Sequence, residues 1–111
     1  NYIYFSSFIF DCLSWSGGNT HLEALAFDKP IITMEGKSLK QNHTFGFLKR
    51  INQDNLIASN EREYINKILE FSKSKNLIKI STEEISNNKN ILFKDMECIK
   101  SLEDSLIKNL F

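Results

Sequence analysis

The sequence carries no net charge, because its 14 lysines and arginines balance its 14 aspartates and glutamates. Without a basic field the chain does not attract nucleic acid or anionic lipid in general, so we expect no nucleic-acid partner. No apolar run approaches the roughly 20 residues that a membrane-spanning helix needs. No charged segment followed by an apolar core marks a signal peptide. We therefore expect no membrane association and a cytoplasmic location.

Cysteine and histidine are scarce, and their spacing fits no common metal site. Cys12 and Cys98 lie far apart without a C-x-x-C spacing, which is most simply explained by two reduced thiols in the core. His21 and His43 do not form an H-E-x-x-H motif, and no cysteine or carboxylate cluster completes a tetrahedral site. The sequence predicts no metal and no metal cofactor.

The residues that are present indicate one small folded domain. The chain has 111 residues, of which 41% are hydrophobic and 25% charged, as in ordinary globular proteins. Its opening segment is rich in aromatic side chains, which we expect in the core rather than at a cofactor. These residues are Tyr2, Tyr4, Phe5, Phe8 and Phe10.

The first third of the chain predicts a β-α-β unit. Residues 8–11 resemble a short buried strand, and the small and polar residues 12–20 form a turn. A helix is expected to begin near residues 18–20 and to end before Pro30, which disfavours a helical predecessor. Residues 30–34 are apolar and β-branched, as in a second buried strand. This order implies a parallel sheet and an α/β fold.

The rest of the chain is expected to be mainly helical, with an apolar stretch at residues 55–58. Apolar residues recur there at helical spacing. Asn60 with Glu63 three residues later matches a capping box, and Ser81 with Glu84 offers a second. The predicted helices cover residues 44–51, 61–71, 78–85 and 95–110. The last helix is amphipathic, and we expect it to pack across the domain or onto a missing half.

Two predicted strands make an incomplete sheet. A parallel sheet needs cover on both faces and neighbours at its edges, so this unit by itself leaves strand edges open. The first residue is Asn rather than Met. Both features favour a fragment from the second half of a larger α/β domain.

The turn between the first strand and the first long helix is the candidate site. Free backbone amides and the positive end of the helix dipole suit a diphosphate there. Gly17 and Gly18 allow close approach of the backbone, and Asn19 and Thr20 offer side-chain donors. Glu23 lies one turn into the helix, where a carboxylate can accept hydrogen bonds from ribose hydroxyls. By spacing alone the signal is weak, and an ordinary turn with Asn19 or Thr20 as the helix N-cap is favoured over an anion site.

Several motifs together resemble one family. The run W-S-G-G-N-T-H-L-E-A-L is followed by D-K-P-I-I-T-M-E-G, then by H-T-F-G-F-L and N-L-I-A-S. In this order and spacing they look like the C-terminal part of the SPINDLY-type, O-linked N-acetylglucosamine transferase family. The resemblance extends from about residue 8 to residue 106. These motifs begin at Trp15, Asp28, His43 and Asn55.

The resemblance implies a GT-B glycosyltransferase, with two Rossmann-like domains facing a cleft. Residues 1–111 would then be the C-terminal portion of the nucleotide-sugar-binding domain, a partial Rossmann-like half-domain with a short parallel sheet and several C-terminal helices. The family transfers a sugar from a UDP-sugar to a protein acceptor by an inverting, metal-independent reaction. The N-terminal GT-B domain and the tetratricopeptide repeats are missing from this sequence, so we expect the fragment alone to be inactive.

The resemblance also assigns roles to individual residues. The segment 18–20 matches the family's diphosphate contact, and Glu23 matches the acid that holds the ribose. His43 matches a family histidine and serves either the cleft or helix packing. His21 replaces a small or hydroxyl residue, and either approaches a phosphate or covers the helix start. Lys40-Gln41-Asn42 stands where bacterial relatives commonly carry arginines, and no residue of the chain is identified as catalytic.

Alternatives stay open at this point. The donor implied by the resemblance is UDP-N-acetylglucosamine, with a Ser or Thr hydroxyl as acceptor. The same residues fit a GT-B enzyme with another sugar donor and acceptor, or a non-catalytic binding or assembly module derived from one. Trp15 either stacks on a uracil or sugar ring or packs beneath the turn.

Overall fold

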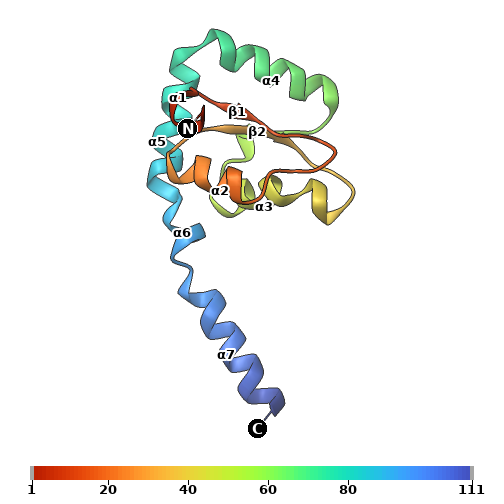
Figure 1. Cartoon of the computed structure of the whole chain (residues 1–111), viewed down its shortest axis with the longest axis vertical. Coiled ribbons are helices and arrows are strands. Elements are labelled where there is room, and N and C mark those ends of the chain that lie inside the picture. The colour runs from red at the N-terminus through yellow and green to blue at the C-terminus, as the bar shows by residue number, and fades with distance from the viewer. Residues whose placement is uncertain (1, 111) are drawn as a thin grey trace.

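The computed structural model describes residues 2–110, so Asn1 and Phe111, the two ends of the predicted 1–111 region, lie outside the described part. The chain folds into a small sheet flanked by helices, with one long helix extending away from it (Figure 1). The elements, in order, are α1 (Tyr2–Phe5), β1 (Ile9–Phe10), α2 (Asn19–Ala26), β2 (Ile31–Met34), η1 (Leu39–Gln41), α3 (His43–Arg50), η2 (Asp54–Leu56), β3 (Ile57–Ala58), α4 (Glu61–Lys73), α5 (Lys75–Asn88), α6 (Asn90–Phe93) and α7 (Met96–Leu110).

The sheet has three parallel strands in the order β1-β2-β3. Ile9 pairs with Ile31 at one edge, and Thr33 pairs with Ile57 at the other. The middle strand β2 is almost wholly buried, which explains its continuous apolar sequence. The predicted β-α-β unit and the α/β fold class, a short parallel sheet followed by several helices, are confirmed.

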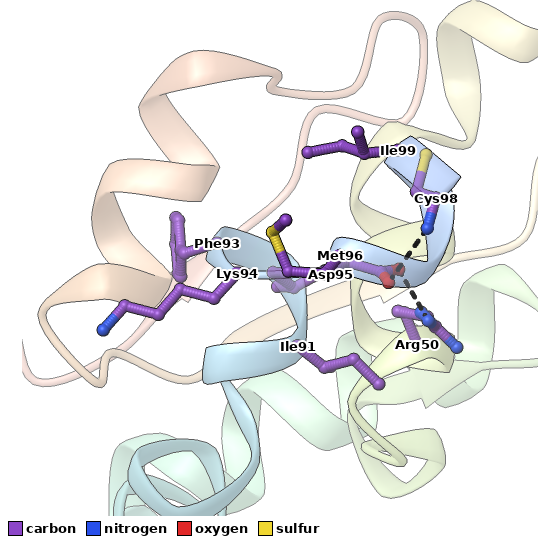
Figure 2. A pocket seen from close by; sticks show the side chains of 9 residues that line it. Arg50, Ile91, Phe93, Lys94, Asp95, Met96, Cys98 and Ile99 are labelled. Atoms are coloured by element: carbon purple, nitrogen blue, oxygen red, sulfur yellow. Dashed lines mark hydrogen bonds and ion pairs between the residues drawn. The ribbon is translucent and has the colours of Figure 1, made fainter. Parts of the chain in front are cut away.

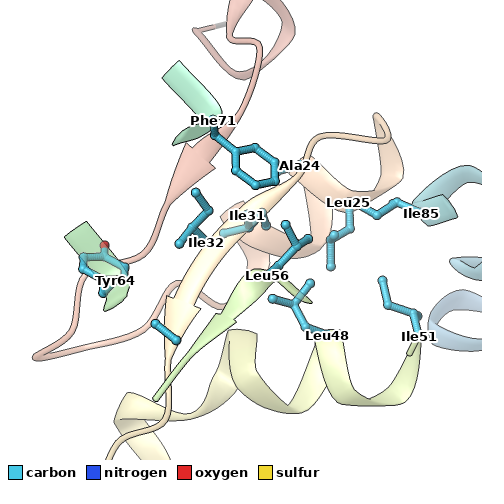
Figure 3. Packing of buried hydrophobic residues seen from close by; sticks show 11 residues of the cluster. Ala24, Leu25, Ile31, Ile32, Leu48, Ile51, Leu56, Tyr64, Phe71 and Ile85 are labelled. Atoms are coloured by element: carbon cyan, nitrogen blue, oxygen red, sulfur yellow. The ribbon is translucent and has the colours of Figure 1, made fainter. Parts of the chain in front are cut away.

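Helices cover both faces of this sheet. In Figure 1, α4 lies over one face, while α2 and α3 lie over the other. Neighbouring residues of β2 point to opposite faces, so Ile31 and Ile32 contribute to different layers. Figure 3 shows Ile32 near Tyr64 and Phe71 of α4. On the other face, the buried residues are Leu25, Leu48, Ile51, Leu56 and Ile85.

The structure corrects several sequence-based boundaries. The apolar stretch at 55–58 contains a third strand, β3, which the sequence analysis did not assign. Helix α5 begins at Lys75 rather than near Ile78, because Ser74 caps it by accepting a hydrogen bond from the Leu77 amide at 3.2 Å. Ser81, predicted as a cap, is instead buried inside this helix. That second capping-box prediction is wrong.

The N-terminal aromatic run is not part of the core, contrary to the prediction. Residues 2–5 form a short helix on the outside, where Tyr2, Tyr4 and Phe5 are exposed. Phe10 is also exposed, and it lies on β1 at the edge of the described sheet. Of this run only Phe8 packs well inward, with its ring centroid 5.8 Å from that of Phe71.

The prediction of two core cysteines is wrong as well. Cys12 lies in the loop after β1, with its sulfur exposed and 3.3 Å from the Ser14 hydroxyl. Cys98 is exposed on α7. Cys12 comes directly after the buried Asp11, whereas Cys98 lies on a helix that has no buried residue.

The last helix, α7, does not pack across the domain. None of its residues is buried, and in Figure 1 it extends away from the sheet and its helices. Among the described residues, no helix is both long enough and apolar enough to cross a membrane.

Candidate functional site

The candidate site lies where β1 ends and α2 begins, at the carboxyl edge of the parallel sheet. Gly18 occupies the N-cap position of α2, and no side chain caps this helix. The amides of Gly18, Asn19 and Thr20 find no acceptor among residues 2–110. Three consecutive donors at the positive end of a helix form a favourable place for an anion. The alternative in which Asn19 or Thr20 caps the helix is therefore wrong.

A buried carboxylate holds this turn in place. Asp11 follows β1 directly and is only 3% exposed. Its Oδ2 accepts hydrogen bonds from the hydroxyls of Ser16 at 2.6 Å and Thr33 at 2.8 Å. Its Oδ1 accepts a third from the Gly17 amide at 3.0 Å. The carboxylate thereby ties both sides of the turn to the central strand β2.

A second set of contacts fastens the turn to α3. Thr44, in the first turn of α3, donates its amide to the Ser16 hydroxyl at 3.0 Å. The two hydroxyls lie 2.9 Å apart, and the Thr44 hydroxyl donates to the Gly17 carbonyl at 3.3 Å. From the opposite face, Tyr64 of α4 donates its hydroxyl to the Asp11 carbonyl. Burial, reinforced by the charge of Asp11, raises the pKa of Tyr64 to about 12, so this hydroxyl keeps its proton at neutral pH.

His21 completes the polar cluster from inside α2. Its side chain is buried, with Nδ1 2.6 Å from the Thr44 hydroxyl and 3.5 Å from the Asp11 carboxylate. Burial lowers the pKa of His21, and the nearby Asp11 opposes this shift. The ring also lies against Gly17, because a Cβ at Gly17 would fall 2.6 Å from three ring carbons. Of the two expectations for His21, covering the helix start describes the contacts that are present.

The predicted binding residues gather at the same edge of the sheet. Asn19 and Thr20 are exposed in the first turn of α2, and Glu23 is exposed one turn further along. His43 begins α3 and lies beside Gly18, since its Nδ1 would be 3.9 Å from a Cβ built there. The sequence predicts that Gly17 lets the backbone approach a ligand. In the structure the His21 ring occupies the space beside the α-carbon of Gly17.

The side chains of Gln41 and Asn42, directly before α3, form hydrogen bonds with neighbouring loops. Gln41 Oε1 accepts hydrogen bonds from the amides of Lys37 and Ser38, and its Nε2 donates to the Leu13 carbonyl. Asn42 accepts from the Gly36 amide at 2.7 Å and donates to the carbonyl of the same residue at 3.0 Å. These side chains close the loop that follows β2 and hold it against the loop that follows β1.

Trp15 does not pack beneath the turn, so that interpretation is wrong. The indole is 65% exposed, next to the buried Ser16. The Lys40 ammonium lies over its ring, 5.5 Å from the centroid. A cation–π contact of this kind orients both side chains at the rim of the site.

Sequence reasoning missed the residues that build the site from below. It did not single out the polar side chains that converge beneath the turn. One signal was available, since a carboxylate directly after one apolar strand and a hydroxyl inside the next must lie close together in a parallel pair. The missed residues are Asp11, Ser16, Thr33, Thr44 and Tyr64.

Two cavities lie elsewhere on the described part of the chain. One, of ≈ 500 Å³, opens beyond the carboxyl ends of β2 and β3 and is crossed by the exposed ion pair of Lys49 and Asp54. The other, of ≈ 370 Å³, lies at the junction of α6 and α7 (Figure 2). There Arg50 Nη2 contacts Asp95 Oδ2 at 2.6 Å. This second cavity is remote from the turn, because α6 lies near the opposite end of α2.

No group of three or more histidines, cysteines, aspartates or glutamates within residues 2–110 is arranged to hold a metal ion. The polar atoms of the turn are amides and hydroxyls, which suit an anion rather than a cation.

Part of an O-GlcNAc transferase mutant from Thermobaculum terrenum has the same fold. The match has a TM-score of 0.78 and 25% sequence identity, and it covers 89% of this chain. This chain spans only 19% of that one. No protein-family model matches the sequence, and no curated protein matches it significantly. The similarity supports a glycosyltransferase-like fold for nearly the whole described chain.

Proposed function

We propose that this chain is the donor-binding region of a glycosyltransferase and holds the diphosphate of a UDP-sugar at the start of α2. The sugar proposed is N-acetylglucosamine, and the proposed acceptor is a Ser or Thr hydroxyl of a protein. The catalytic groups and the acceptor site belong to the N-terminal GT-B domain and the tetratricopeptide repeats, outside these residues. The chain alone is therefore inactive.

One observation carries the proposal. The uncapped start of α2 presents three amides at the carboxyl edge of a parallel sheet, in a fold shared with part of an O-GlcNAc transferase. Open parallel sheets bind ligands at this edge. The cluster around Asp11 supports the proposal further, because it fixes the turn before a ligand arrives. Donors that are already in place cost little to organise when charge builds up on a departing diphosphate.

The remaining residues have roles that fit a nucleoside diphosphate. The side chains of Asn19 and Thr20 lie in the exposed first turn of α2. Their carboxamide and hydroxyl groups are within reach of a phosphate held by the backbone amides. Glu23 is exposed on the same helix and offers a carboxylate to ribose hydroxyls. The inverting reaction proposed needs no metal, because amides and the helix dipole stabilise the leaving diphosphate.

Calorimetric titration of the full chain with UDP tests this proposal. We expect measurable binding that weakens by about 1–3 kcal/mol in Glu23→Ala, the usual range for a hydrogen bond to a charged group. Thr20→Ala is expected to weaken binding by about 1 kcal/mol, as for a neutral hydrogen bond. Glu103→Ala is the matched control, because it removes an exposed glutamate on α7, far from the turn.

Failure of the folded wild-type chain to bind UDP would contradict the proposal. Equal weakening in Glu23→Ala and Glu103→Ala would show a general effect of charge instead of a ribose contact. Competition between UDP-N-acetylglucosamine and UDP-glucose then identifies the sugar. Tighter binding of UDP-glucose would favour a donor other than UDP-N-acetylglucosamine.

A non-catalytic module is a second candidate, and one observation favours it. Gln41 and Asn42 stand where the resemblance leads us to expect arginines. Their side chains instead form hydrogen bonds with the loop around Gly36. Lys40, the remaining cation of this segment, is directed to Trp15. Residues 40–42, directly before α3, therefore offer no arginine fork for a bidentate phosphate contact. Sugar transfer by the complete protein would exclude this candidate, whereas UDP binding without transfer would support it.

A further inference from the structure

We infer that His21, paired with Asp11, is a positioning residue of the donor site, which shapes the Gly17–Gly18 turn and takes up a proton when a diphosphate binds at the start of α2. This inference rests on the proposed function, because it concerns the same anion. The inference goes beyond the proposed function because it links ligand binding to protonation of a side chain that the ligand does not need to touch.

The ring supports the turn by direct contact. A Cβ at Gly17 would lie 2.6 Å from three carbons of the imidazole, so the turn can approach the ring only because residue 17 is glycine. The turn is thus held on one side by the flat imidazole and on the other by bonds to Asp11 and Thr44. The amides of Gly18, Asn19 and Thr20 come directly after Gly17 in the chain, so the contact with the ring also positions them.

The hydrogen bonds of the ring define which nitrogen accepts the proton. Nδ1 faces two oxygens, the Thr44 hydroxyl at 2.6 Å and the Asp11 carboxylate at 3.5 Å. The Thr44 hydroxyl donates to the Gly17 carbonyl, and the carboxylate can only accept. The neutral ring therefore carries its hydrogen on Nδ1. A proton from solvent adds to Nε2 and converts the ring to imidazolium.

Asp11 is the charged group that acts on His21. Three other titratable side chains stand near the pair: Tyr64 from α4, Cys12 beside Asp11, and His43 from α3. Tyr64 keeps its proton because its pKa lies at about 12. Lys40 is turned toward Trp15 at the rim. His21 is thus the group in direct contact with Asp11 that can change its charge near neutral pH.

A bound diphosphate changes the balance that keeps the ring neutral. In the unliganded chain, burial lowers the pKa of His21 despite the attraction of Asp11. A diphosphate above the neighbouring amides adds negative charge close to the ring and favours the imidazolium. By linkage, the ligand that raises the proton affinity of His21 must itself bind more tightly as the pH falls.

UDP titration calorimetry of the full chain at about pH 6 and about pH 8, on either side of the ordinary histidine pKa of about 6.5, measures this coupling. UDP titrates in the same range, so the quantity compared is the difference between wild type and His21→Gln. We expect wild type to gain about threefold more affinity than the variant on going to the lower pH, a modest coupling between two sites. Proton uptake on binding, from buffers of different ionisation enthalpy, should be lower in the variant.

The second histidine supplies the competing explanation. The chain contains only His21 and His43, so His43→Gln separates their contributions. Loss of the extra pH dependence in His43→Gln, with its retention in His21→Gln, would overturn the inference. Equal pH dependence in wild type and His21→Gln would do the same, while leaving UDP binding itself intact. No UDP binding by wild type at either pH would remove both the inference and the proposed function.

A direct titration covers the case in which His21→Gln fails to fold. The His21 ring protons of wild type, followed by NMR with and without saturating UDP, report the midpoint of its protonation. We expect this midpoint to move to higher pH with UDP. An unchanged midpoint would overturn the inference without any variant, and a purely supporting role for the ring would leave it unchanged.

Discussion

At the scale of single residues, the site depends on one buried carboxylate and the groups that satisfy it. Asp11 receives hydrogen bonds from Ser16, Thr33 and the Gly17 amide, which come from the turn and from β2. A buried charge is tolerated only when its acceptor sites are filled in this way. These hydrogen bonds tie the turn to the core beneath it.

Gly17→Ala is expected to destabilise the chain by about 1–3 kcal/mol, as overpacking in a close-packed site does. The reason is the 2.6 Å approach of the new Cβ to the His21 ring. Backbone strain is not involved, because no glycine among the described residues has a positive φ. Urea unfolding of the single variant, of His21→Ala and of the double variant measures the effect.

The double variant identifies the cause of this cost. In the His21→Ala background the ring is absent, so the added methyl group of Gly17→Ala should cost much less than in wild type. A cost that is the same in both backgrounds would show that the two residues act independently.

His21 also makes folding stability dependent on pH. Its pKa is lowered in the folded chain below the ordinary value of 6.5. The unfolded chain therefore binds the proton more readily, and stability falls as the pH drops below about 6.5. Above that value both states are neutral and the contribution is constant. Urea unfolding across this range should show a smaller loss in His21→Gln than in wild type, and parallel curves would contradict the assignment.

At the scale of elements, the helices differ in how their first turns are satisfied. Asn60 caps α4 by accepting from the Glu63 amide at 2.9 Å, while Glu63 in return accepts from the Ser59 amide at 2.7 Å. Ser74 caps α5. Helix α2 alone among these three has no side-chain cap. Helix α3 also has no cap from its N-cap side chain, but its Thr44 amide donates to the Ser16 hydroxyl, so side-chain oxygens accept from the first turns of α3, α4 and α5.

Asn60→Ala is expected to cost about 1 kcal/mol, the usual value of an N-cap. Thermal or urea unfolding measures it, with Asn60→Asp retaining most of the stability because aspartate also caps. Asn66→Ala is the matched control in the exposed middle of α4, where alanine favours the helix and should be neutral or slightly stabilising. Equal losses at both positions would contradict the role of the cap.

At the scale of the whole molecule, α7 extends from a small core to which it contributes no buried residue. The radius of gyration is 15.6 Å, whereas about 13 Å is typical for a chain of this length. The difference follows from α7, which extends along the long axis in Figure 1. The core itself is centred on β2 and is completed by Ile85 of α5.

Removal of residues 97–111 is therefore expected to change the free energy of unfolding by less than about 1 kcal/mol, as for exposed positions in general. Asp95, which contacts Arg50, is retained in this truncation. Ile85→Ala should instead cost about 2–5 kcal/mol, because it empties a fully buried position. A large loss of stability on truncation, measured by urea unfolding at low protein concentration, would show that α7 contributes to the fold after all.

The sequence by itself determined the local elements whose signals are short-range. The β-α-β order, the end of α2 before Pro30, the Asn60 cap and the amphipathic α7 all follow from spacing, turn residues and capping groups within a few positions. It also located the candidate site, since a Gly-rich segment between strand and helix is visible without coordinates. These features depend on interactions between residues that are close along the chain.

Only the tertiary structure decided which residues are buried and which distant ones meet. Exposure of the N-terminal aromatic residues and of both cysteines depends on what lies beside them, and no local pattern encodes this. The pairing of His21 with Thr44 joins positions 23 residues apart, and that of Tyr64 with Asp11 spans 53. Such contacts arise when β1, β2 and their covering helices assemble. The physical reason is that burial and charge coupling are properties of the assembled sheet and helices, whereas helix starts and turns are properties of the chain.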